Sequence, residues 1–166
     1  MELVRTKSKI QVTTPQHSYP PFKLGLTGAH QVSNALGAIR LLEALQDLGI
    51  SVGIDAIVTG LSGVVWPGRL EMMSVGDEGT LLLDAAHNPA AATALSRYLR
   101  ATYPSGLPIV LGVMDDKDVD GIVTALNPCA TRFICSTPDT PRAVAASELA
   151  ERVRRLSGPT PGSTEP

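Results

Sequence analysis

A chain of 166 residues, of which 43% are hydrophobic, is long enough to bury one domain core with part of a second domain attached. The formal net charge of −2 and the lack of a dense lysine or arginine cluster argue against a nucleic-acid surface. No apolar run is long enough to span a bilayer and no leader follows Met1, so we expect a cytoplasmic protein that does not bind a membrane.

The first part of the chain predicts two short strands and two helices. Lys9–Thr13 and Phe22–Leu26 are partly alternating and are separated by prolines, which is typical of strands joined by a constrained link. From His30, apolar residues recur at helical spacing until Gly49 ends the helix. A shorter helix is expected within residues 49–63.

A break in the pattern at Val64–Gly68 predicts a domain boundary, because the periodicity changes there from helix to strand across Pro67 and Gly68. We expect residues 1–62 to be the end of one domain and residues 63–157 to form a second. Residues 158–166, rich in Pro, Gly, Ser and Thr, predict a mobile tail.

The second domain is predicted to be an α/β domain. Leu70–Val75 and Thr80–Asp84 predict an antiparallel hairpin, and helices and strands then alternate. The alternating segments are Pro89–Thr102 (helix), Leu107–Gly112 (strand), a helix around Val119–Leu126, Arg132–Cys135 (strand) and Ala143–Leu156 (helix). This order implies parallel pairing, hence a Rossmann-like layered sheet, mostly parallel, with helices on both faces.

Three polar residues fall where a buried strand gives way to a helix. Leu81–Leu83 ends in Asp84, and Asn88 followed by Pro89 is a typical helix start. Asp84, His87 and Asn88 therefore lie at a strand's carboxyl end and a helix's amino end, where open α/β sheets bind nucleotides and anions.

Each candidate side chain also has an ordinary structural explanation. Asp84 can accept hydrogen bonds from a ribose or cap the next turn, and Arg69 can bind a phosphate or lie at the surface. His87 can orient a ligand or move a proton, or it can be a packed or solvated side chain. The polar start of the helix at His30, including Asn34, can equally be a solvated helix end. The charged loop Gly112–Asp118 faces the same predicted edge.

Several motifs are absent. The sequence has no Walker-type phosphate loop, no G-x-G-x-x-G fingerprint, no nucleophile elbow and no metal-binding carboxylate cluster. Cys129 and Cys135 lack the spacing of zinc ligands, so we expect two small thiols in a reducing compartment. The residues thus predict part of a nucleotide site without a complete catalytic apparatus.

A set of motifs, in this order and spacing, resembles folylpolyglutamate synthase/dihydrofolate synthase of the Mur ligase superfamily. They are Leu26-Thr27-Gly28-Ala29-His30-Gln31-Val32-Ser33-Asn34-Ala35, Trp66-Pro67-Gly68-Arg69-Leu70-Glu71, Leu83-Asp84-Ala85-Ala86-His87-Asn88-Pro89, Asp116-Lys117-Asp118 and Pro141-Arg142-Ala143. The likeness extends over roughly residues 22–155. It implies the last third of such an enzyme, from the end of the central ATPase domain onward.

The resemblance implies an ATP-dependent ligase of folate biosynthesis that joins glutamate to dihydropteroate or folate through an acyl phosphate. Asn34 matches the residue at adenine, Arg69 the one at the phosphates and Asp84 the one at the ribose. His87 matches a histidine near the reacting phosphate or the incoming amino acid. We expect Mg²⁺ to be held by the missing part of the enzyme.

Further expectations follow from the resemblance. The sequence is expected to be a fragment truncated on both sides, inactive alone and monomeric, with small molecules as partners: ATP or ADP, glutamate, and folate or dihydropteroate. Ser136 and Arg142 lie just beyond another strand's carboxyl end and are our candidates for the glutamate site. Two alternatives stay open: a related Mur-type amino-acid ligase domain, or a non-catalytic α/β module that binds a small ligand or a partner protein.

Overall fold

The computed structural model describes residues 2–5 and 9–157, and these form two compact units, Met1–Ala85 and Ala86–Pro166. Each unit is described by itself. The tail predicted for residues 158–166 lies outside the described residues. Among the residues described, no helix is both long and apolar enough to cross a membrane.

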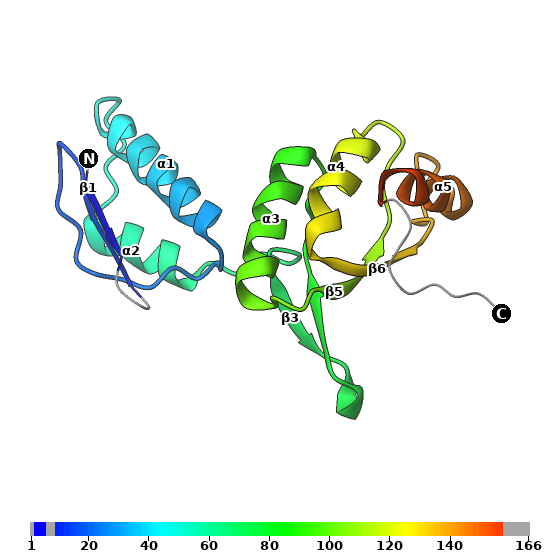
Figure 1. Ribbon diagram of the computed structural model, residues 1–166. Helices are drawn as coiled ribbons and strands as arrows, with labels where there is room; N and C mark the ends of the chain where they lie inside the picture. Colours follow the sequence, from blue (N-terminus) through cyan, green and yellow to red (C-terminus); the bar gives the residue numbers. More distant parts are fainter. Residues whose placement is uncertain (1, 6–8, 158–166) are drawn as a thin grey trace. The chain divides into compact units, whose positions relative to one another are not determined.

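The first unit begins with an antiparallel strand pair and two helices. Strand β1 (Glu2–Arg5), which the sequence did not predict, pairs with β2 (Ile10–Thr13), and helices α1 (Ala29–Gln46) and α2 (Ile54–Gly63) follow (Figure 1). The strand predicted at Phe22–Leu26 is wrong. Phe22 makes only an isolated bridge to Ile10. Three residues later the Gly25 N–H donates to the Leu61 carbonyl at 2.9 Å, so the chain turns to α2 instead of extending the sheet.

One apolar cluster holds these elements together. Buried side chains from β2, α1, α2 and the link between them meet in it: Ile10, Val12, Tyr19, Phe22, Val32, Ile39 and Ile57. The helical spacing of Val32 and Ile39 on α1 is what brings that helix face to the strand pair. Gly49 has a positive φ of 82°, as expected for a glycine that ends a helix.

A separate antiparallel hairpin completes the first unit. Strands β3 (Glu71–Ser74) and β4 (Thr80–Leu83) pair in register, with Met72 opposite Leu82, and a 3₁₀ turn at Gly76–Glu78 joins them (Figure 1). The predicted hairpin is therefore confirmed. At the open end of the hairpin, Leu70 directly precedes β3 and Asp84 directly follows β4, so these two candidate segments lie together.

The second unit alternates helices and strands as the sequence predicts. In order it contains α3 (Pro89–Thr102), β5 (Leu107–Leu111), α4 (Val119–Leu126), a 3₁₀ turn at Asn127–Cys129, β6 (Ala130–Cys135) and α5 (Ala146–Ser157) (Figure 1). Strands β5 and β6 pair in parallel through the α4 crossover. With its parallel pair, antiparallel hairpin and helices, the structure confirms the α/β fold class.

Packing in the second unit follows the two periodicities of its elements. Helix α4 contacts both α3 and α5, and its Ile122 and Val123 are fully buried together with Leu149 of α5. Along β5 and β6, Ile109, Phe133 and Cys135 are half-buried and Leu111 is buried, while the paired residues Val110 and Ile134 stay exposed on the other face. This arrangement sends the loops that follow β5 and β6 to one edge.

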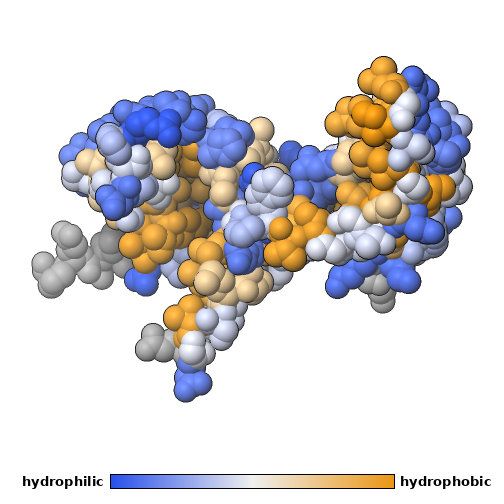
Figure 2. Space-filling view, turned by 180° about the vertical axis from the view of Figure 1, so that it is seen from behind, coloured by the Kyte–Doolittle hydropathy of each residue, from blue (hydrophilic) through white to orange (hydrophobic). Residues whose placement is uncertain are grey.

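The surface carries several exposed apolar side chains, visible as orange patches in a hydropathy view (Figure 2). The end of α1 and the following turn expose Leu41, Leu48 and Ile50, and the hairpin exposes Met72, Met73, Val75 and Leu81.

The predicted boundary near residue 63 does not coincide with the division after Ala85. It remains a prediction about domains, since compactness alone does not define where a domain begins.

Candidate functional site

A hydrogen-bonded turn joins the end of β4 to the start of β3. The Leu70 N–H donates to Oδ2 of Asp84 at 3.0 Å, and the Ala85 N–H donates to the Gly68 carbonyl at 2.8 Å. The Gly68 N–H in turn donates to Oε2 of Glu71 at 2.8 Å. Arg69 therefore lies between two residues whose backbones are held: Asp84 accepts from the Leu70 N–H, and Ala85 and Glu71 bond to the backbone of Gly68.

This turn has an unusual backbone. Gly68 has φ 69° and Leu70 has φ 49°, a left-handed conformation that a branched side chain rarely adopts. The side chain of Leu70 is nevertheless 5% exposed, so its burial offsets the backbone strain. The strained, anchored turn holds the half-buried Arg69 between two fixed residues.

A small pocket of about 160 Å³ lies beside the turn. Its lining comes from the segment before α1 and from the segment around the turn: Gly25, Leu26, Thr27, Val64, Val65, Trp66, Arg69, Leu70 and Glu71. A Cβ placed on Gly28 would lie 3.1 Å from Cδ1 of Leu70, so the amino end of α1 also lies against this turn. Two of the motif segments that are far apart in the sequence therefore meet here.

Polar side chains at the start of α1 form a hydrogen-bonded chain. Nδ2 of Asn34 donates to Oε1 of Gln31 at 3.0 Å, and Nε2 of Gln31 lies 3.0 Å from Nε2 of His30. Gln31 is buried, whereas Asn34 is exposed. Sequence reasoning assigned no role to Gln31. The sequence feature that could have identified Gln31 as buried is its position next to Val32, on the face of α1 that packs inward.

His87 and Asn88 belong to the second unit, at the start of α3. Both are exposed. Oδ1 of Asn88 accepts the Ala91 N–H at 2.9 Å, and Pro89 occupies the first helical position, so the predicted helix start is confirmed. Asn34, Arg69 and Asp84 lie in the first unit instead, and the structure describes each set within its own unit.

A second charged cluster lies where β5 and β6 end. Nζ of Lys117 is 2.6 Å from Oδ2 of Asp116, and a guanidinium nitrogen of Arg142 is 3.7 Å from the same oxygen. The backbone joins the two loops, since the Asp115 N–H donates to the Arg142 carbonyl at 2.7 Å. Ser136 directly follows β6 and donates its N–H to the Leu111 carbonyl at 2.9 Å.

The electrostatics of this cluster favour an ionised Asp116. The hydrogen bond from Lys117 holds the pKa of the Asp116 carboxyl below its usual range, against a smaller opposing effect of burial, and the charges of Lys117 and Arg142 act in the same direction. The neighbouring Asp118 caps α4, because Oδ1 accepts the Gly121 N–H at 2.9 Å. The loop lies at the carboxyl ends of β5 and β6, beside Arg142.

Metal-binding groups were sought among the side chains that the structure describes. No group of three or more His, Cys, Asp or Glu side chains suited to a metal ion is present in that part of the chain. Cys129 is buried and Cys135 is half-buried, and both are free thiols. Magnesium ligands are therefore not assigned to these residues.

Comparison with known proteins gives the class to which this fold and these motifs belong. Residues 68–165 match the family described as "Mur ligase, glutamate ligase domain". This match covers more than half of the chain, and the chain belongs to that family. It includes the hairpin, the Asp84 segment and all the elements of the second unit.

The relatives include proteins named dihydrofolate synthase/folylpolyglutamate synthase and, at 30% identity over 93% of this chain and 28% of that protein, a Corynebacterium efficiens UDP-N-acetylmuramoyl-L-alanyl-D-glutamate–2,6-diaminopimelate ligase. The chain is 38% identical to a Mycobacterium tuberculosis dihydrofolate synthase/folylpolyglutamate synthase, over 85% of this chain and 29% of that protein. A solved structure of M. tuberculosis folylpolyglutamate synthase complexed with ADP matches 91% of this chain and 33% of that chain, with 36% identity and a TM-score of 0.77. A bifunctional folylpolyglutamate synthase/dihydrofolate synthase with Mn, AMPPNP and L-glutamate bound matches 89% of this chain and 34% of that chain, with 25% identity and a TM-score of 0.71.

Proposed function

We propose that this chain is the carboxy-terminal domain of an ATP-dependent ligase that adds L-glutamate to dihydropteroate or folate through an acyl phosphate. Membership of the Mur ligase family and the names of its relatives support this proposal. The chain spans only about a third of the length of the relatives it matches. The activity therefore belongs to a longer protein, and we expect this chain alone to be inactive.

The observation that supports the nucleotide site best is the hydrogen bond from the Leu70 N–H to Asp84. It fixes the turn that presents Arg69, whose guanidinium is suited to bidentate contact with phosphate. We assign Arg69 to the nucleotide phosphates, Asp84 to the ribose and Asn34 to the adenine. The small, open pocket beside the turn is lined by Arg69 together with Trp66 and Thr27.

The second unit supplies the groups that we assign to the reacting end of the ligands. His87 and Asn88 start α3, where the positive end of the helix dipole favours anions such as phosphate. We propose that Ser136 and Arg142 bind glutamate, with Lys117 held next to Arg142 by their shared partner Asp116. Closure over the nucleotide would exclude the water that hydrolyses an acyl phosphate.

The proposed ligase also needs Mg²⁺, and we place the nucleotide-binding groups above in this chain and the metal ligands in the rest of the longer protein. Magnesium neutralises phosphate charge in phosphoryl transfer. As the family resemblance implies, we expect the magnesium ligands in the part of the longer protein that this chain does not span. We further expect a cytoplasmic monomer whose partners are small molecules.

The test is calorimetric titration of this chain with ADP, compared with an Arg69→Ala variant. Loss of a bidentate charge-assisted contact weakens binding by about tenfold or more. Arg132→Ala is the matched control, because Arg132 is an exposed arginine on β6 outside the proposed site. We expect the control to bind ADP like the unmodified chain.

Two results would count against the proposal. Equal ADP affinity in the Arg69 and Arg132 variants would remove Arg69 from the site. Tight binding of an amino acid other than glutamate, with glutamate inactive as a competitor, would favour a different Mur-type ligase.

A further inference from the structure

A second pocket lies in the second unit, at the opposite edge of the β5–β6 pair from the Asp116 cluster. It has a volume of about 570 Å³, within the range of small-molecule sites. Its lining comes from the end of α3, the turn before β5 and the turn before β6: Arg97, Arg100, Ala101, Tyr103, Pro104, Gly106, Pro128 and Cys129. One strand length, about 15 Å, separates these two edges.

The segments that form this pocket are uniformly positive. Residues 89–114 and 121–138 contain Arg97, Arg100 and Arg132 and no aspartate or glutamate, although the whole chain has a net charge of −2. Among the described residues, neither Arg97 nor Arg100 has an ion-pair or hydrogen-bond partner. By contrast, Arg152 and Arg155 of α5 both pair with Asp120.

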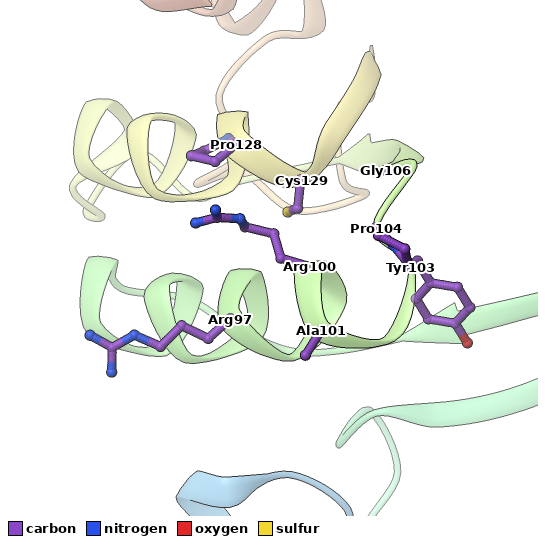
Figure 3. Close-up of a pocket in the computed structure, with 8 residues that line it drawn as sticks. All are labelled: Arg97, Arg100, Ala101, Tyr103, Pro104, Gly106, Pro128 and Cys129. Carbon is purple, nitrogen blue, oxygen red and sulfur yellow. The ribbon is translucent and has the colours of Figure 1, made fainter.

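The two arginines are placed to act on one ligand. Arg97 and Arg100 are three residues apart on α3, so their side chains are neighbours on the helix surface and repel each other. Figure 3 shows both side chains reaching in the same direction along the helix, with Arg100 extending toward Pro128. An anion between them would relieve the repulsion and accept charge-assisted hydrogen bonds from both guanidinium groups.

The remainder of the pocket suits the organic part of a ligand. Ala101, Pro104 and Pro128 provide apolar surface, and the ring of Tyr103 lies at the end away from the arginines, with its hydroxyl pointing outward (Figure 3). Two backbone hydrogen bonds hold this turn, because the Tyr103 N–H donates to the Leu99 carbonyl at 2.6 Å and the Gly106 N–H donates to the Tyr103 carbonyl at 2.9 Å. The pocket therefore offers a cationic end and an apolar end.

We propose that this pocket binds a small organic anion, with a phosphate or carboxylate group at Arg97 and Arg100 and a compact apolar body against Ala101, Pro104 and the Tyr103 ring. This site is separate from the proposed ligase site and does not depend on it. It contains no residue that we assign to nucleotide or glutamate.

The test is an amide NMR titration of the chain with phenyl phosphate, and with phenylacetate to distinguish phosphate from carboxylate. We expect saturable shifts of the Ala101, Gly106 and Cys129 amides with at least one of the two. An Arg97→Gln/Arg100→Gln variant should bind about tenfold more weakly or not at all. Arg154→Gln, at an exposed arginine of α5, is the matched control and should bind normally.

Additional ligands test each end of the pocket. Inorganic phosphate lacks the apolar body and phenol lacks the anion, so each should bind more weakly than phenyl phosphate. Absence of saturable shifts with both anions would overturn the proposal, as would shifts that the folded double variant retains. Equal binding of phenol and phenyl phosphate would also overturn it, because the arginines would then have no role.

Discussion

At the scale of single residues, the most unusual side chain outside the proposed sites is Glu43, a carboxylate buried in α1. Oε1 of Glu43 accepts hydrogen bonds from the Thr14 hydroxyl at 2.6 Å and from the Tyr19 hydroxyl at 3.0 Å, and Arg40 pairs with Oε2. Burial raises the pKa of Glu43, but these hydrogen bonds and the Arg40 charge outweigh it, so the pKa lies below its usual value. Burial and Glu43 together raise the pKa of Tyr19 to about 12.

Glu43 should make the stability of the first unit depend on pH. Because its pKa is lower in the folded state, its contribution is present above the unfolded-state value of about 4.3 and is lost as the pH falls through the folded-state value. Glu43→Gln should cost about 2 kcal/mol at neutral pH, since it weakens hydrogen bonds to a charged group. Denaturant unfolding across pH measures both effects.

The matched control for this prediction is Glu151→Gln, at an exposed glutamate of α5. It should leave the unfolding free energy and its acid dependence unchanged. If Glu43→Gln retains the full acid-induced loss of stability, the buried carboxylate is not its source. The burial of Glu43 was not predicted, because sequence periodicity identifies the inward face of α1 but cannot show that Thr14 and Tyr19 provide hydrogen-bond partners there.

At the scale of elements, local rules predicted most of the second unit. Helix α3 has the predicted bounds, because Asn88 and Pro89 define its start chemically. The strand predicted at Phe22–Leu26 failed because pairing is decided by distant partners: Phe22 reaches only Ile10, and Gly25 bonds to Leu61. Strand β1 was missed for the same reason, since a short strand depends on the partner it finds.

The cap of α3 allows a direct test at this scale. Asn88→Ala removes the acceptor for the Ala91 N–H and should lower the unfolding free energy by about 1 kcal/mol. Asn88→Asp and Asn88→Ser retain a capping oxygen and should be nearly neutral. Thermal unfolding of the three variants decides the matter, and equal melting temperatures for all three would show that the cap contributes no stability.

At the scale of the whole molecule, the sequence located the candidate site better than it explained it. Asp84 and Arg69 were singled out separately, one from a strand end and one from a Pro-Gly turn. In the structure Asp84 accepts a hydrogen bond from the N–H of Leu70, the residue after Arg69. Leu70 has a left-handed backbone conformation, which the residue pattern does not predict. The pocket formed by Gly25–Thr27 and Trp66–Glu71 also required a tertiary contact between distant segments.

The most direct measurement of the central claim is an amide NMR map of the chain titrated with ADP. The proposed site predicts the largest shifts at Gly68, Arg69, Leu70, Asp84 and the indole N–H of Trp66, the chain's only tryptophan. Arg69→Ala should weaken these shifts, whereas Arg132→Ala should preserve them. Saturable ADP shifts that avoid the Gly68–Leu70 turn and Asp84, or no saturable shifts in a folded chain, would contradict a nucleotide site at this turn.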